Sequence, residues 1–141
     1  MDKSKEQKDL SEKTIKGLHI LLAEDNELNM EIAEFMFQNE DAEVTKAWNG
    51  LEAVEIFEKS SPGEFDVILM DIMMPVMNGY EAAKRIRSLD REDAQVIPII
   101  AMTANAFVED RMKAKEAGMN EHIGKPVDGK LLVKIIHELV E

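Results

Sequence analysis

The sequence has 141 residues, 45% of them hydrophobic and 33% charged, with a net charge of −12. This size and composition are typical of one globular domain with a buried core. The lack of cysteine excludes disulfides and thiolate chemistry, the negative charge argues against direct binding of nucleic acid, and no apolar run is long enough to span a membrane.

Residues 1–17 are polar and highly charged, and we expect them to form a tail or linker ahead of a domain over residues 18–141. They hold five lysines against four acids, a balance of +1, so the domain itself carries −13. The first residues lack the apolar stretch of a signal peptide, which favours a cytoplasmic protein without membrane insertion.

From residue 19 onward, short apolar runs alternate with segments of helical period. Three nearly continuous runs, at residues 20–23, 67–70 and 97–102, predict strands, and weaker strands are expected at 43–46 and around 121–124. Strands that are apolar throughout are buried on both faces, which is typical of parallel sheets. Pro98 cannot donate a hydrogen bond to a sheet, so it should lie near the start of its strand.

Five helices are expected between and after these strands. Their apolar residues are Leu28, Ile32, Phe35 and Met36 on one face over 27–39; Leu51, Val54 and Phe57; Tyr80, Ala83 and Ile86; Phe107, Val108 and Met112; and Leu131, Leu132, Ile135, Ile136 and Leu139. Asn49, with Glu52 as reciprocal partner, and Asp128 are predicted N-caps. The alternation predicts an α/β fold: a flavodoxin-like, doubly wound, five-stranded parallel sheet of order 2-1-3-4-5.

Polar side chains follow the predicted strands at their carboxyl ends, where open α/β sheets bind ligands. Glu24 and Asp25 follow the first strand, Asp71 the third, Thr103 the fourth and Lys125 the fifth. Carboxylates brought together from adjacent strands repel one another unless they are protonated or bridged by a cation. Mg²⁺ is a hard cation that binds such oxygens, so this edge of the sheet is a candidate magnesium site.

Four stretches at these strand ends resemble the receiver domain of response regulators in two-component signalling. They are residues 21–26 (LLAEDN), 69–79 (LMDIMMPVMNG), 100–104 (IAMTA) and 125–126 (KP), and the resemblance covers residues 18–141. It implies that Asp71 is the nucleophile and phosphoacceptor. It also implies that Glu24 and Asp25 form an acidic pair, with Asp25 the more direct metal ligand.

The same resemblance assigns the remaining site residues. The backbone carbonyl of Met73 would be a further metal ligand, and Lys125 and Thr103 would contact phosphoryl oxygens. Pro126 would follow a cis peptide bond that aims Lys125 inward. Receivers often carry Tyr or Phe as a switch residue three positions before this lysine; here His122 stands there, either as a switch with Thr103 or as a half-buried histidine without that role.

The implied activity is Mg²⁺-dependent transfer of a phosphoryl group to Asp71 from a phosphohistidine on a histidine kinase or histidine phosphotransfer protein. Phosphorylation of Asp71 would reshape the surface of the fourth helix, fifth strand and fifth helix. A weak homodimer could form through the same surface. Such a phosphoprotein is a signalling domain that catalyses its own phosphorylation and dephosphorylation, not a conventional enzyme. Its parent could be a stand-alone regulator or a hybrid histidine kinase.

Four other functions remain as alternatives. A relay or phosphate-sink receiver would pass the phosphoryl group on without a conformational output. A haloacid-dehalogenase-like phosphatase needs a second acid two residues after its nucleophile, where this chain has Met73. A flavodoxin needs a loop rich in Ser, Thr and Gly after the first strand, and the acids of residues 24–27 would repel its FMN phosphate. A receiver that cannot be phosphorylated is disfavoured because every required residue is present.

Overall fold

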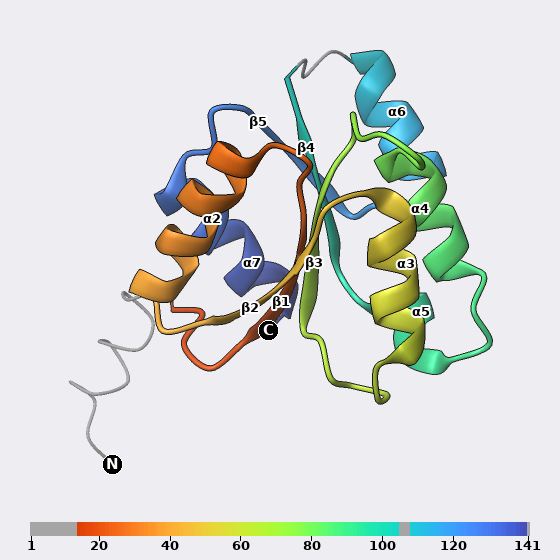
Figure 1. The fold of residues 1–141 in the computed structure, drawn as a ribbon, viewed down its shortest axis with the longest axis horizontal. Helices are drawn as coiled ribbons and strands as arrows, with labels where there is room; N and C mark the ends of the chain where they lie inside the picture. Colours follow the sequence, from red (N-terminus) through yellow and green to blue (C-terminus); the bar gives the residue numbers. More distant parts are fainter. Residues whose placement is uncertain (1–13, 105–107, 141) are drawn as a thin grey trace.

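A computed structural model describes residues 14–104 and 108–140, which form five strands and six helices around one sheet (Figure 1). In chain order the elements are β1 (His19–Ala23), α2 (Glu27–Asn39), β2 (Glu43–Ala47), α3 (Gly50–Lys59), β3 (Val67–Asp71), α4 (Gly79–Arg87), α5 (Glu92–Val96), β4 (Ile99–Thr103), α6 (Val108–Glu116), β5 (Glu121–Gly124) and α7 (Gly129–Val140).

The sheet is parallel throughout, with the strand order β2-β1-β3-β4-β5 that the sequence predicts. Helices α2 and α7 cover one face, and α3 to α6 cover the other (Figure 1). Strand residues alternate between two cores: Leu21 and Ile68 pack toward α3 and α4, whereas Ile20 and Leu69 pack toward α2 and α7. Every residue of β3 and β4 is buried, which explains why these strands are uninterrupted apolar runs.

Pro98 and the predicted N-caps occupy the positions expected of them. Pro98 lies just before β4, and its carbonyl accepts a hydrogen bond from the Ile68 N–H at 2.9 Å. The Asn49 side chain accepts from the Glu52 N–H at 2.8 Å, and the Asp128 carboxylate accepts from the Leu131 N–H at 3.3 Å. These side chains satisfy backbone N–H groups that have no partner within the first helical turn.

The sixth helix, α5, is an addition to the five that the sequence predicts. It lies between α4 and β4 and buries Ala94. Arg91 precedes it, pairs with Asp93 at 2.7 Å and places its guanidinium 4.7 Å from the centre of the Phe57 ring. This single turn carries too few apolar residues to show a helical period, so the sequence pattern does not reveal it.

Three of the four residues on the apolar face predicted for α2 are exposed, and only Met36 is half-buried against the core. Leu28, Ile32 and Phe35 are 64%, 60% and 66% exposed, whereas Met30 and Phe37 make the buried contacts. Helix α2 therefore carries apolar residues on two faces, and the periodic pattern alone does not identify which one packs.

Exposed apolar side chains also occur on the later helices. Met112 on α6 is 59% exposed and Leu131 on α7 is 46% exposed. Phe107, predicted to lie on the same helix as Met112, is outside the described residues. Helix α6 packs through Ala114 instead, and α7 through its other apolar residues, Leu132 and Ile136 among them.

The chain ahead of β1 contributes to the core. Ile15, in the segment expected to be a tail, is 1% exposed and packs on the α2 and α7 side of the sheet. The Gly17 N–H donates to the Asp41 carbonyl at 2.9 Å. Within residues 14–104 and 108–140, no helix combines the length and apolar character that crossing a bilayer requires.

Candidate functional site

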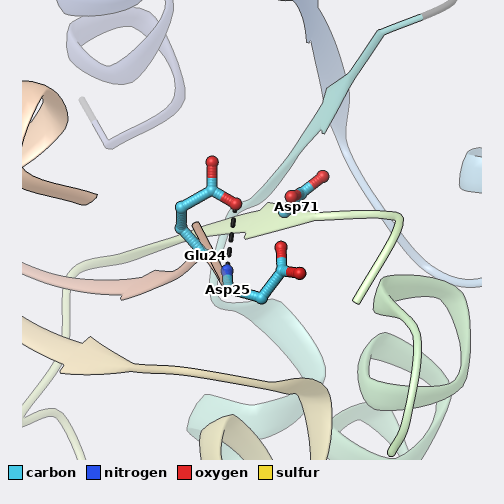
Figure 2. Close-up of side chains that lie close together, drawn as sticks. All are labelled: Glu24, Asp25 and Asp71. Carbon is cyan, nitrogen blue, oxygen red and sulfur yellow. Dashed lines mark hydrogen bonds between the residues drawn. The ribbon is translucent and has the colours of Figure 1, made fainter. Parts of the chain in front are cut away.

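Three carboxyl groups meet at the carboxyl ends of β1 and β3, which are neighbours in the sheet. Glu24 and Asp25 directly follow β1, and Asp71 is the last residue of β3. One carboxylate oxygen from each lies within 4.8 Å of the others, and Figure 2 shows the three side chains gathered there. Glu24 and Asp71 are only 1% and 4% exposed, whereas Asp25 lies at the open side.

Lys125 joins the two buried carboxylates. Its Nζ lies 3.0 Å from Glu24 Oε1 and 2.9 Å from Asp71 Oδ2, so one ammonium group donates to both. The lysine comes from the segment after β5, where its backbone N–H donates to the Thr103 carbonyl at 2.9 Å. The Lys125–Pro126 peptide bond is cis, as predicted.

The ionisation of the site reflects this burial and pairing. The pKa of Asp71 is raised from its usual 3.8 to about 7, chiefly because burial disfavours its charged form and because Glu24 lies beside it; Lys125 acts in the opposite direction. Burial also pushes the pKa of Glu24 upward, but hydrogen bonding to Asp71 and Lys125 outweighs burial and lowers it. Without a cation, Glu24 is therefore charged, and Asp71 takes up a proton as the pH falls through about 7.

The donor set fits a hard divalent cation. Three carboxylates face one lysine, so the group keeps an excess of negative charge that a metal ion would neutralise. All the available donors are oxygens, and Asp25 is exposed enough for an ion to enter with part of its water shell. The residues present are therefore suited to Mg²⁺.

Thr103 and Met73 lie at the same edge of the sheet as the carboxylates. Thr103 ends β4, next to β3, and is 7% exposed. The Met73 N–H donates to Asp71 Oδ1 at 3.3 Å, while its side chain is 76% exposed. The backbone of Met73, and not its exposed thioether, is thus the part in contact with Asp71.

His122 lies apart from the carboxylates, within β5. Its Nε2 accepts a hydrogen bond from Arg111 Nε on α6 at 3.1 Å, and its Nδ1 lies 3.7 Å from a Glu121 oxygen. The half-buried histidine therefore connects β5 to α6 at the surface.

Two features of the site do not follow from the sequence motifs. The first is a cavity of about 130 Å³ between α2 and the segment after β5; Ile32, Met36 and Val127 are among its apolar lining residues, and Glu24 and Lys125 also line it. The second is the close backbone packing of Gly50 and Gly79 against the loop that follows Asp71. Both depend on how segments far apart in the chain pack together, which no local pattern of residues records.

The response regulator receiver domain model matches residues 20–137. Histidine kinase 1 of Arabidopsis thaliana is 34% identical over 161 aligned positions, which cover 93% of this chain but only 13% of that kinase.

Solved structures agree with this match. The receiver domain of sensor histidine kinase PA1611 from Pseudomonas aeruginosa is 38% identical, with a TM-score of 0.79 over 88% of this chain and 98% of that one; it has a magnesium ion coordinated in its active-site cleft. The receiver domain of Saccharomyces cerevisiae Ssk1, in complex with the histidine phosphotransfer protein Ypd1, is 32% identical, with a TM-score of 0.78 over 89% of this chain and 90% of that one. The chain thus belongs to the response regulator receiver domain family of two-component signalling.

Proposed function

We propose that this domain accepts a phosphoryl group on Asp71 from a phosphohistidine of a partner protein. The observation that carries the proposal is the pairing of one lysine, Lys125, with two buried carboxylates of a cluster of three. Glu24, Asp25, Asp71 and the Met73 carbonyl would hold Mg²⁺. When bound, the ion supplies charge neutralisation for the phosphoryl oxygens.

The chemistry assigned to the protein residues is mainly positioning. An oxygen of the Asp71 carboxylate forms the new bond to phosphorus as the bond between phosphorus and the histidine nitrogen breaks; the bonding electrons stay on the imidazole, which takes a proton from solvent. Lys125 Nζ already lies 2.9 Å from Asp71 Oδ2. After transfer it would donate a hydrogen bond to a phosphoryl oxygen and stabilise its negative charge. Thr103, at the end of the next strand, would donate to another. Attack of water on the acyl phosphate later restores the carboxylate.

The exposed face of α2 favours a protein as the donor. Leu28, Ile32 and Phe35 form an apolar surface next to the cavity that Glu24 and Lys125 line. An apolar surface beside a reactive site marks a place for a partner. The related receiver in complex with a histidine phosphotransfer protein supports a partner of that class here.

We further propose that phosphorylation changes the surface formed by α6, β5 and α7. Thr103 precedes the connection to α6, and Lys125 lies between β5 and α7, so a new dianion that attracts both would act on this region at two points. The Arg111–His122 hydrogen bond lies within the same surface. The change would be a shift between conformations that already coexist.

A phosphotransfer assay tests donor and acceptor together. A histidine phosphotransfer protein carrying labelled phosphohistidine should pass the label to the wild-type domain but not to Asp71→Asn. Ile32→Ser should slow this transfer at least about fivefold, which corresponds to ~1 kcal/mol of docking energy. Labelling by a small acyl phosphate should be unchanged because the α2 surface is not needed for it.

Val96→Ser is a matched control for Ile32→Ser. Val96 is an aliphatic residue that is 75% exposed, and it lies on α5, across the sheet from α2. Equal slowing by both substitutions would refute docking on α2. Transfer to Asp71→Asn at the wild-type rate would refute the proposal that Asp71 accepts the phosphoryl group.

A further inference from the structure

We propose that the short segment Ala47–Gly50, between β2 and α3, sets the spacing between the two halves of the acidic site. One half is Glu24 and Asp25 after β1, and the other is Asp71 with the loop that follows it. The inference rests on the proposed metal site and adds a positioning element that contributes no carboxylate to it.

Backbone hydrogen bonds connect the segment to both halves. At one end, the Ala47 carbonyl accepts from the Glu24 N–H at 3.0 Å. At the other end, the Gly50 N–H donates to the Met77 carbonyl at 3.0 Å, and Met77 belongs to the loop after Asp71. The N-cap bond from the Glu52 N–H to Asn49 fixes the turn between these ends. Four residues therefore link the backbone of the acidic pair to residues 72–78, the loop after Asp71, which we call the acceptor loop.

The packing at Gly50 leaves no room for a side chain. A Cβ there would lie 2.2 Å from the Met77 carbonyl oxygen and 2.8 Å from its carbon. Gly79, at the end of the same loop, packs against the start of the loop, where a Cβ would lie 2.4 Å from the Asp71 carbonyl oxygen. Both contacts are with backbone atoms, so a rotamer change cannot relieve them.

A methyl group at Gly50 would displace the acceptor loop. The Met77 oxygen would have to move from 2.2 Å to at least 3.0 Å, a shift of about 0.8 Å. Ligands must be held to within about 0.5 Å of their working geometry, and Mg²⁺ tolerates little departure from an octahedron. Gly50 does not have a left-handed φ and begins a helix, so its own backbone conformation accepts alanine. The expected effect is therefore on the loop.

Magnesium binding without phosphorylation tests the inference. Isothermal titration measures the binding, and the fluorescence of Trp48, the single tryptophan and a residue of the segment itself, is followed in parallel. Gly50→Ala should raise the Kd for Mg²⁺ at least about tenfold. Gly63→Ala is the matched control, because Gly63 has a φ of +80° and a Cβ added there would meet no atom within 4 Å, so alanine strains the chain without displacing the loop. Its Kd should stay within about twofold of wild type.

The outcomes separate the inference from the proposed function. A wild-type domain that binds no Mg²⁺ would overturn both. If wild type binds Mg²⁺ and Gly50→Ala binds it with the same Kd, only the positioning role is overturned. The same holds if Gly63→Ala loses as much Mg²⁺ affinity as Gly50→Ala. If Gly50→Ala does not fold, Asn49→Ala removes the 2.8 Å cap bond without adding an atom near Met77. Its Kd should rise about threefold, and an unchanged Kd would refute the role of the segment.

Discussion

The proton on Asp71 makes the stability of the metal-free domain depend on pH. We consider a domain kept free of Mg²⁺ with a chelator while the pH is raised from 5.5 to 8.5, and compare wild type with Asp71→Asn. The variant keeps the size of the side chain and removes its titration. Any pH dependence that is common to both proteins then cancels in the difference.

The direction and size follow from the raised pKa of Asp71, from 3.8 to about 7. Between these values the folded domain binds a proton that the unfolded chain has lost, so stability falls as pH rises and levels off above the folded pKa. One pKa unit corresponds to ~1.4 kcal/mol, so the 1.5 units between pH 5.5 and 7 correspond to about 2 kcal/mol. Wild type should lose this amount relative to Asp71→Asn.

Urea denaturation followed by circular dichroism measures the free energy of unfolding at each pH. Saturating Mg²⁺ should reduce the pH dependence of wild type, because a bound cation keeps Asp71 charged at lower pH. Two outcomes would refute this account of the Asp71 proton. One is that the free energies of unfolding of the two proteins in chelator change in parallel with pH. The other is that wild type gains stability relative to the variant toward pH 8.5.

Three further predictions concern the other site residues and the output surface. Asp25→Asn should be more stable than wild type in chelator and show a smaller increase in melting temperature with Mg²⁺; equal increases would remove Asp25 from the site. Lys125→Met should lower the free energy of unfolding of the metal-free domain by about 2 kcal/mol at pH 8, and by less at pH 6, where Asp71 is protonated; equal losses at the two pH values would contradict this pairing. Beryllofluoride should change hydrogen exchange at α6 and around His122, whereas changes confined to the loops after β1 and β3 would indicate a phosphate sink.

The sheet and the grouping of the site residues could be predicted because both depend on regular features of the sequence. Continuous apolar runs mark strands buried on both faces, and parallel strands bring their carboxyl ends to one edge. Glu24, Asp71 and Lys125 are far apart in the chain, yet each follows or ends a predicted strand, and the structure brings both carboxylates within hydrogen-bonding distance of the lysine.

The features that escaped prediction depend on tertiary contacts. The 3.6-residue period of α2 marks an apolar face but does not say whether that face meets the sheet or a partner. The contact of Gly50 with Met77 joins backbones 27 positions apart, and a glycine in a sequence does not reveal what approaches it. His122 could be placed near the lysine, but its hydrogen bond to Arg111 depends on how α6 packs against β5.

The most direct test of phosphorylation at Asp71 is the intact mass of the domain after incubation with Mg²⁺ and a small acyl phosphate. We predict a single addition of about 80 Da, the mass of HPO₃. The addition should be lost in base or hydroxylamine, as expected of an acyl phosphate, and should be absent when Mg²⁺ is chelated or when Asp71 is replaced by asparagine. An Asp71→Asn domain that gains the same mass with the same lability would contradict the assignment of Asp71 as the acceptor.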